Sequence, residues 1–289
     1  MKTFCGYICL FGKPNAGKST ILNSLMGFKL SIVNRKAQTT RNKILGILTE
    51  ENHQAVLTDV PGIIEPKYEL QSLMVKEIKS ALSDADFILY IIDSAEYNKD
   101  EFIANLKLID DKKYAIVLNK IDEINNERLI EIGKELNEIV KSEIIPLSAK
   151  SGFNMDTLKK TIFENLPESP FLYDSESTTD KPEKFFVSEI IRNNILSLFQ
   201  EEIPYSVHID VREFKEEENK KDFINADIIV ERESQKIIII GRGGNMIKKI
   251  GQNSRRQIEE FLEREVVLKL FVKVKSDWRR DERYLKSLF

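Results

Sequence analysis

The stretch that decides the fold reads Gly12-Lys13-Pro14-Asn15-Ala16-Gly17-Lys18-Ser19. It matches the pattern G-x-x-x-x-G-K-[ST], in which a glycine-rich turn aims backbone N–H groups at phosphates. An apolar run over residues 4–11 precedes it, and the helix that we expect from Lys18 adds the partial positive charge of its N-terminus. The pattern and its flanks predict a nucleoside triphosphate site, with Lys18 on the β- and γ-phosphates and Ser19 on Mg²⁺.

A second motif, Asp59-Val60-Pro61-Gly62, ends an alternating run over residues 53–58. Such alternation predicts a strand, and the carboxyl ends of parallel strands meet at the edge of the sheet where α/β proteins bind nucleotides. We therefore expect the Asp59 carboxylate to reach Mg²⁺ through a water molecule. Gly62 lies three residues further on, where its amide can turn toward a γ-phosphate.

Two later motifs predict which base is bound. Asn119-Lys120-Ile121-Asp122 closes an apolar run over residues 114–118, and Ser148-Ala149-Lys150 follows another over residues 143–147. Asp122 can accept two hydrogen bonds from the N1–H and 2-amino groups of guanine, and the later motif can brace the base from the other side. Adenine lacks this pair of donors and would leave a buried carboxylate unpaired, so the motif favours GTP over ATP.

Each of these short motifs alone would fit an ordinary surface loop. Their order along the chain, each at the end of an apolar strand, favours a GTP-binding domain. The expected contacts with GTP or GDP are made by Gly12, Asn15, Ala16, Gly17, Lys18, Ser19, Thr20, Asp59, Gly62, Asn119, Lys120, Asp122, Ser148, Ala149 and Lys150.

The C-terminal end of the chain is basic. Residues 236–289 contain fourteen Lys or Arg and seven Asp or Glu, a net charge of +7 on a chain whose total is −3, so residues 1–235 carry −10. A basic end on an acidic protein suggests a polyanionic partner. A solvated helix surface is the alternative interpretation.

A second glycine motif lies inside this basic end. The apolar segment 236–240 leads into Gly241-Arg242-Gly243-Gly244, and residues 245–250 have helical spacing. This arrangement resembles the KH module, whose Gly-x-x-Gly loop between two helices lets a nucleic-acid backbone approach closely. The strands of the prokaryotic KH fold would be supplied by residues 206–214, 222–233 and 265–275. The RNA would be contacted by Gly241, Arg242, Gly243, Gly244, Lys248, Lys249, Arg255 and Arg256.

Over nearly its whole length the chain resembles the Era family of translation-factor-like GTPases. The resemblance is carried by the four nucleotide motifs and by residues 35–41, 201–207 and 240–244. Val60 is a departure, since the family usually has Thr at this position, which points away from the Mg²⁺ ligands; we expect little effect. The resemblance implies a GTP phosphohydrolase with GTP or GDP and Mg²⁺ as cofactors.

The resemblance also implies a set of metal ligands. Thr40 aligns with the threonine of the first switch segment that joins Ser19 and Asp59 at Mg²⁺, and Thr39 is the alternative. Related GTPases with Asn at the position of Asn15 bind K⁺ there, which would add positive charge to the site. A hydrogen bond of Asn15 within its own loop is an equally good interpretation.

Hydrolysis is expected to be slow. Ras-type enzymes carry a water-positioning Gln just after Gly62, whereas Ile63 and Ile64 stand there in this chain. Neither side chain can orient water, so we expect the transition-state charge to be stabilised by Lys18, Mg²⁺ and backbone amides. The predicted catalytic residues are Lys18, Thr40 and Gly62.

The predicted fold class is α/β: a Ras-like P-loop GTPase domain with a mostly parallel sheet, followed by a smaller α+β type II KH domain. We expect the GTPase domain over residues 1–167, a linker over 168–183 and the KH domain over 184–289. The stretch from residue 167 to residue 183 contains Pro167, Pro170 and Pro182 and a run of Ser and Thr, which mark an extended linker. An ordered loop packed on one domain is the alternative for its first half.

Two functions are compatible with these features. In the favoured one, the GTP state controls a KH domain that binds the 3′ end of small-subunit (16S) ribosomal RNA during maturation of the 30S subunit, and hydrolysis times release. In the alternative, the protein is a GTP-sensing signalling switch whose basic end contacts anionic lipid at the cytoplasmic face of the membrane. We expect a monomeric cytoplasmic protein. A signal peptide is not expected, because Lys2 is followed directly by the first strand.

Three single residues complete the expectations. Cys5 and Cys9 lie on one face of the first strand and are predicted to be buried, reduced thiols. Trp278 either stacks on a base or packs in the core, and packing is the commoner outcome for a single Trp.

Overall fold

The computed structural model describes residues 2–34, 36, 39–109, 111–200, 202–216, 221–286 and 288. The chain divides into two compact units. The first comprises Met1–Pro66 and Gln71–Asp180, and the second comprises Lys67–Leu70 and Lys181–Phe289.

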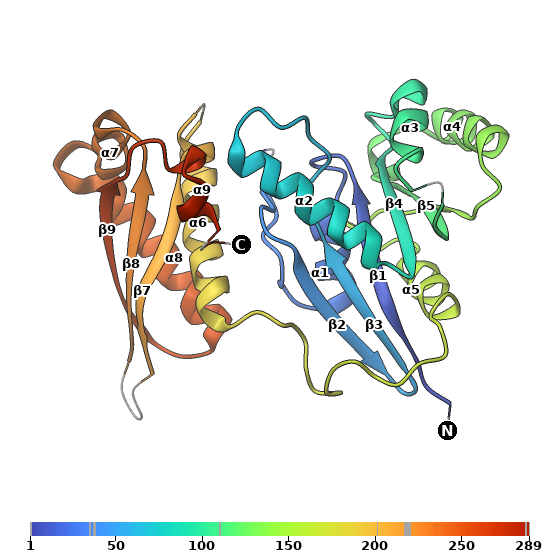
Figure 1. The fold of residues 1–289 in the computed structure, drawn as a ribbon, viewed down its shortest axis with the longest axis horizontal. Helices are drawn as coiled ribbons and strands as arrows, with labels where there is room; N and C mark the ends of the chain where they lie inside the picture. Colours follow the sequence, from blue (N-terminus) through green and yellow to red (C-terminus); the bar gives the residue numbers. More distant parts are fainter. Residues whose placement is uncertain are drawn as a thin grey trace. The chain divides into compact units, whose positions relative to one another are not determined.

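The first unit is built on a six-stranded sheet in the order β2-β3-β1-β4-β5-β6 (Figure 1). All neighbours are parallel except β2 and β3, which are antiparallel. The strands are β1 (Phe4–Gly12), β2 (Ile44–Glu50), β3 (His53–Asp59), β4 (Phe87–Asp93), β5 (Tyr114–Asn119) and β6 (Ile144–Pro146). Nearly every residue of the central strands is buried, as expected for parallel strands covered on both faces.

Helices cover both faces of this sheet. Figure 1 shows α2 in front of the strands and α1 behind them. Apolar residues of α2, α3 and α4 form one core with residues of β1, β4 and β5, while α1 and α5 contact β3 on the other face. The helices are α1 (Lys18–Met26), α2 (Glu69–Asp84), α3 (Lys99–Leu106), α4 (Asn126–Ile139) and α5 (Met155–Glu164), with a short 3₁₀ helix η1 (Ile121–Glu123). The predicted α/β GTPase fold is confirmed.

The two cysteines of β1 are buried and free, as predicted. Cys9 is fully enclosed, and burial raises the pKa of its thiol to about 12. Burial also raises the pKa of the Cys5 thiol. Both side chains therefore act as small apolar groups within the sheet.

The segment after α5 lies along the first unit. Gln54 accepts hydrogen bonds through Oε1 from the N–H groups of Leu172 (2.9 Å) and Tyr173 (3.0 Å), and its Nε2 donates to the Tyr173 carbonyl (3.0 Å). The Ile47 N–H donates to the Thr178 carbonyl at 2.9 Å. These bonds fit the interpretation of residues 172–178 as an ordered loop packed on one domain.

The second unit has a three-stranded sheet in the order β7-β8-β9. β7 and β8 are antiparallel, and β8 and β9 are parallel. Apolar residues of α6, α7 and α8 form one core with the sheet. The elements are α6 (Glu183–Leu198), η2 (Ile203–Tyr205), β7 (His208–Lys215), β8 (Asp222–Val230), α7 (Glu233–Ile240), η3 (Arg242–Gly244), α8 (Asn245–Leu262), β9 (Val266–Val274), η4 (Trp278–Arg280) and α9 (Glu282–Leu285).

The apolar segment before the second glycine motif is helical. It forms most of α7, so successive isoleucines face different directions: Ile239 is fully buried, while Ile237 and Ile238 are exposed. Trp278 is 1% exposed, and its Nε1 donates to the Ser206 carbonyl at 3.0 Å. The single Trp therefore packs in the core of the second unit.

Candidate functional site

The phosphate loop connects β1 to α1 through positions that only glycine fits. Gly12 and Gly17 have φ values of 151° and 101°. A Cβ at Gly17 would lie 2.0 Å from Nδ2 of Asn119, and one at Gly12 would lie 2.3 Å from the carbonyl oxygen of Ile91. The turn therefore requires both glycines, for their conformation and for the close approach of β4 and β5.

Lys18, the first residue of α1, is held inside this loop. Its side chain is buried, and Nζ donates to the carbonyls of Gly12 (3.1 Å) and Lys13 (2.8 Å). Burial lowers the pKa of this amine to about 8, and the Asp59 carboxylate opposes part of that effect. The amine is thus placed in the bend where the loop would cradle phosphates.

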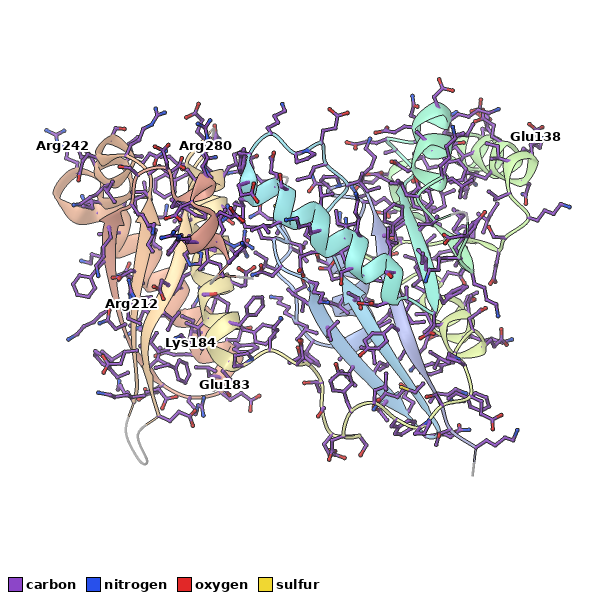
Figure 2. The ribbon with its side chains drawn as sticks, viewed as in Figure 1. Glu138, Glu183, Lys184, Arg212, Arg242 and Arg280 are labelled. Carbon is purple, nitrogen blue, oxygen red and sulfur yellow. The ribbon has the colours of Figure 1, made fainter. Side chains whose placement is uncertain are left out.

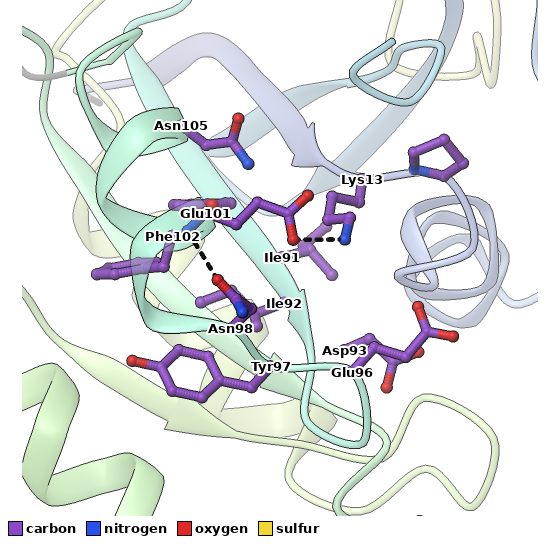
Figure 3. A pocket seen from close by; sticks show the side chains of 12 residues that line it. Lys13, Ile91, Ile92, Asp93, Glu96, Tyr97, Asn98, Glu101, Phe102 and Asn105 are labelled. Atoms are coloured by element: carbon purple, nitrogen blue, oxygen red, sulfur yellow. Dashed lines mark hydrogen bonds and ion pairs between the residues drawn. The ribbon is translucent and has the colours of Figure 1, made fainter.

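The second residue of the loop faces a small cavity between the loop and α3 (Figure 3). Lys13 Nζ lies 2.7 Å from Glu101 Oε2, and Glu101 stands in the first turn of α3. The Asn98 side chain caps this helix by accepting from the Glu101 N–H at 3.0 Å. The ion pair therefore fastens the phosphate loop to a capped helix end.

Three hydroxyl groups converge on the Asp59 carboxylate, which is fully buried at the end of β3. Ser19 Oγ donates to Oδ2 at 2.6 Å, Thr40 Oγ1 donates at 3.3 Å, and the two hydroxyl oxygens lie 3.1 Å apart. Burial raises the pKa of Asp59, while Lys18 and the hydroxyl donors lower it. Oδ1 is buried without a hydrogen-bond partner among the described residues.

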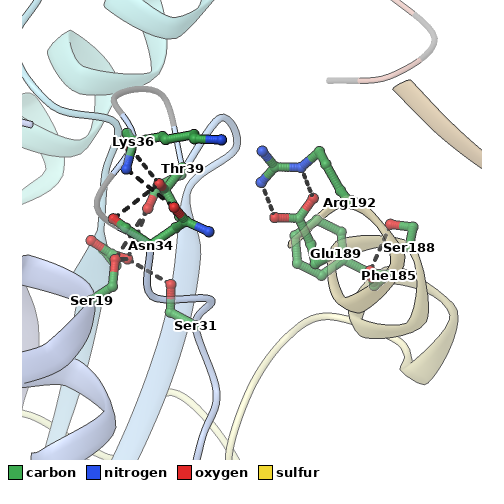
Figure 4. Close-up of polar contacts among 11 residues, drawn as sticks. Ser19, Ser31, Asn34, Lys36, Thr39, Phe185, Ser188, Glu189 and Arg192 are labelled. Carbon is green, nitrogen blue, oxygen red and sulfur yellow. Dashed lines mark hydrogen bonds and ion pairs between the residues drawn. The ribbon is translucent and has the colours of Figure 1, made fainter. Parts of the chain in front are cut away.

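This donor set fits Mg²⁺. Hydroxyl and carboxylate oxygens are the ligands that the ion prefers, and an unpartnered buried carboxylate oxygen suits a bond from a metal-bound water. Thr40 faces the cluster, whereas Thr39 Oγ1 donates to the Lys36 carbonyl at 2.6 Å (Figure 4). The geometry thus favours Thr40 over Thr39. Arg35, Ala37 and Gln38 of the same segment lie outside the described residues.

The third hydroxyl group that contacts Asp59 belongs to a residue that the sequence did not single out. Ser31 Oγ donates to Oδ2 at 2.9 Å, and Figure 4 shows Ser31 beneath the switch segment. A lone serine between a helix and a polar loop carries no local signal, because its partner is 28 residues away.

Asn119 joins three of the predicted motifs. Its Nδ2 donates to the Ala16 carbonyl at 2.8 Å, and its Oδ1 accepts from the Ala149 N–H at 3.1 Å. Both bonds are buried, so this side chain fastens the phosphate loop to the loop after β6. The sequence predicted a direct nucleotide contact at this position; in the structure, the amide bonds to the two loops.

The remaining residues of the base motif are less buried than Asn119. Lys120 adopts a left-handed backbone conformation (φ 62°) and forms an ion pair with Asp93, at the end of β4. Asp122, in η1, and Lys150 are exposed. The burial of the Asp122 carboxylate that the sequence argument assumed is therefore not seen in the structure, because the short helix η1 has no buried residue. Asp93 is a site residue that the motif search missed, since it belongs to no predicted motif.

Gly62 lies against the phosphate loop. A Cβ at Gly62 would lie 2.3 Å from the backbone nitrogen of Pro14, so this segment touches the phosphate loop. Val60 is fully buried in the apolar core, which agrees with a side chain that points away from the metal ligands. Ile63 packs against the same core.

The second glycine motif turns the chain from α7 into α8. Gly241, Gly243 and Gly244 have φ values of 72°, 62° and 77°. A Cβ at Gly241 would lie 2.6 Å from Cβ of Met246, whereas Gly243 and Gly244 have open space around them. Arg242 points outward at this end of the unit (Figure 2).

The cations of this motif form a track along α8. Lys248, Lys249, Arg255 and Arg256 are exposed, and their seven-residue spacing places them on one side of the helix over two turns. Exposed cations beside an open glycine loop match what a phosphate backbone requires. Among the described residues, no helix is long and apolar enough to cross a membrane.

Comparisons with known proteins cover parts of both units of the chain. Residues 7–120 match the family described as 50S ribosome-binding GTPase, and residues 202–279 match the KH domain. GTPase Era of Lactobacillus delbrueckii subsp. bulgaricus is 43% identical over 285 residues, covering 98% of this chain and 95% of the relative. GTPase Era of Clostridium botulinum is 41% identical over 286 residues, covering 98% and 97%.

Two crystal structures extend the likeness to three dimensions. A variant of Aquifex aeolicus Era bound to GDP·AlF4⁻ is 39% identical with a TM-score of 0.93, covering 98% of each chain. Era in complex with MgGDPNP and nucleotides 1506–1542 of 16S ribosomal RNA gives the same identity, score and coverage. With relatives this similar over the full length, the chain belongs to the Era family of GTPases.

Proposed function

We propose that this protein binds and slowly hydrolyses GTP and uses its KH domain to bind the 3′ end of 16S ribosomal RNA during assembly of the 30S subunit, in the cytoplasm. The observation that carries the GTPase part is the convergence of Ser19 and Thr40 on the buried Asp59 carboxylate, next to the loop that encloses Lys18. Phosphate ligands and metal ligands are thus built into one edge of the sheet.

Each group of residues has a separate role in hydrolysis. Lys18 and the loop amides hold the β- and γ-phosphates, and Gly62 offers its amide to the γ-phosphate. Ser19, Thr40 and Asp59 would hold Mg²⁺, which neutralises charge that develops on the phosphates. Because Ile63 and Ile64 replace a residue that orients water, turnover is slow, which suits a timer.

Base recognition rests on Asp122, with Lys120 and the loop of Ser148 to Lys150 beside it. The exposed carboxylate accepts from the guanine N1–H and 2-amino groups, while Asn119 holds the surrounding loops in place. An adenine would leave the carboxylate without these donors, so the motif favours GTP over ATP.

The RNA part rests on the open glycine loop and the cationic track of α8. A relative 39% identical to this chain binds nucleotides 1506–1542 of 16S ribosomal RNA. In this chain, Gly243 and Gly244 leave space for a backbone, and Arg242, Lys248 and Lys249 lie where they neutralise phosphates.

The experiment is a titration of a labelled oligonucleotide that copies the 3′ end of 16S ribosomal RNA. The protein is loaded with GDP or with a non-hydrolysable GTP analogue, and a scrambled oligonucleotide is the control. Tight binding that depends on the analogue supports the proposal. An affinity no higher than that for the scrambled sequence in both states would refute ribosomal RNA recognition and favour the signalling alternative.

A matched pair of variants separates RNA binding from attraction to lipid. Gly243→Asp introduces a negative charge where a Cβ meets nothing within 4 Å, and Gly243→Asn introduces the same shape without charge. Both residue types tolerate the left-handed conformation. We expect Gly243→Asp to abolish RNA binding and to spare GTP hydrolysis. Anionic vesicles test the membrane contact, which depends on charge alone and gains nothing from a glycine loop.

The proposal includes K⁺ beside Asn15 as an activating ion. Asn15 is exposed and has a left-handed backbone conformation (φ 63°) within the phosphate loop. Faster turnover in potassium than in sodium buffer at equal ionic strength supports this part. Equal turnover would remove it and leave the rest of the proposal intact.

A further inference from the structure

One side chain holds the segment that leads from α1 to the first switch. Asn23, on α1, accepts hydrogen bonds through Oδ1 from the N–H groups of Leu30 (2.9 Å) and Ser31 (2.7 Å). Its Nδ2 donates to the Ser31 carbonyl at 2.8 Å. Gly27 ends the helix in a left-handed conformation (φ 77°), which turns the chain back toward Asn23. A single amide therefore fixes the backbone at residues 30–31.

This clamp places the Ser31 hydroxyl on the Asp59 carboxylate. The Ser31 Oγ donates to Oδ2 at 2.9 Å, and the two residues are 4% and 0% exposed. Both partners are thus shielded from water, and a hydrogen bond to a buried carboxylate is among the stronger ones. The bond links the start of the switch segment to the end of β3.

The distribution of donors on Asp59 indicates what Ser31 is for. Ser19, Thr40 and Ser31 all bond Oδ2, although one carboxylate oxygen offers about two lone-pair sites. Ser19 and Thr40 are the proposed metal ligands, whereas Ser31 is anchored by Asn23. Ser31 is therefore the donor whose position does not depend on the metal.

We propose that Asn23 and Ser31 are positioning residues of the Mg²⁺ site. The Asn23 amide holds Ser31, and the Ser31 hydroxyl holds Oδ2 of Asp59, which leaves the unpartnered Oδ1 for the water shell of the ion. The inference rests on the proposed function, because it takes Ser19, Thr40 and Asp59 as the Mg²⁺ site. Partners that orient the ligands of a metal typically change its affinity 10–100-fold.

Ser31→Ala tests the hydroxyl, and Ser24→Ala is the matched control because Ser24 is exposed on α1, next to Asn23. The affinity for a fluorescent GDP is measured across a Mg²⁺ titration and in EDTA, together with the thermal unfolding midpoint. We expect the Mg²⁺ midpoint of Ser31→Ala to rise about 10–100-fold. Its affinity for GDP in EDTA should match that of the control, while its unfolding midpoint should fall because a buried hydrogen bond is lost.

Two results would overturn the inference. One is a Mg²⁺ midpoint equal to that of the control. The other is an affinity for GDP lowered equally with Mg²⁺ and in EDTA, which would mean a purely structural role. A wild-type protein that binds no GDP at all would instead refute the proposed function itself, so the two failures are distinguishable.

Asn23→Ala supplies a second and independent measurement, which decides the matter if Ser31→Ala does not fold. Without the clamp, the Mg²⁺ midpoint should rise in the same direction. Because the two residues act in series, the double variant should shift the midpoint no further than the larger single shift. Additive shifts, or an unchanged midpoint for Asn23→Ala, would contradict the clamp.

Discussion

Asn119→Ala should lower the free energy of unfolding of the first unit by more than most single substitutions do. The change deletes two buried hydrogen bonds, from Nδ2 to the Ala16 carbonyl and from the Ala149 N–H to Oδ1. It leaves both backbone groups without those partners. Each such group costs about 1–3 kcal/mol, so the sum is about 2–6 kcal/mol.

The assay uses the single Trp of the chain as an internal reference. Trp278 is buried in the second unit, so its fluorescence follows unfolding of the KH domain, while far-UV circular dichroism in urea also follows the first unit. The dichroism transition should move to lower urea, and the fluorescence transition should stay in place. The affinity for GDP should fall as well, because the phosphate loop loses its fastening.

Asn137→Ala is the matched control. Its Nδ2 also donates to a backbone carbonyl, that of Gly133, but the bond is exposed on α4. Substitutions at such positions usually change the free energy of unfolding by less than about 0.5 kcal/mol. An effect of Asn119→Ala no larger than that of the control would refute the role given to this amide.

Three further predictions test other parts of the structure. Lys18 has a pKa lowered to about 8, so its amine is largely neutral at pH 9; phosphates favour the charged form, and GDP binding should take up a proton at pH 9 but not at pH 6.5. Calorimetry in buffers of different ionisation enthalpy measures this uptake, and equal heats at pH 9 would contradict the shift. Trp278→Phe removes the bond to the Ser206 carbonyl and should destabilise the KH domain by about 1–3 kcal/mol in a thermal melt followed by circular dichroism, whereas an unchanged melt would show that the bond is dispensable. Gln54→Ala should let chymotrypsin cleave near Tyr173 faster than in the exposed control Gln200→Ala, and equal rates would mean that other contacts hold the loop.

The elements that the sequence predicted most firmly are those with a local pattern. β1 and β3 end at their motifs as expected, and the helix after the phosphate loop begins at Lys18. β4 was not singled out, because all seven of its residues are buried and the alternation that marks a half-exposed strand is absent. α7 was recognised only as an apolar segment, since four consecutive isoleucines suggest no helical period.

In the candidate site too, features with a local sequence pattern were predicted, and features without one were missed. The order of the four motifs predicted a GTP site, because each motif is contiguous and brings its own backbone geometry. The choice of Thr40 over Thr39 came from the resemblance, and the bond of Thr40 to Asp59 supports it. Ser31 and Asp93 were missed, because each acts through a partner distant in sequence.

The sequence by itself determined which chemical groups this protein carries and in what order: a phosphate loop, the motif of Asp59, the motif of Asn119 to Asp122 and a glycine loop within a basic end. Only the tertiary structure decided how these groups support one another. Asn119 reaches Ala16 across 103 residues, and Asn23 brings Ser31 to Asp59. The physical reason is that a motif encodes local conformation, whereas hydrogen bonds between distant segments depend on how the strands of the sheet are ordered.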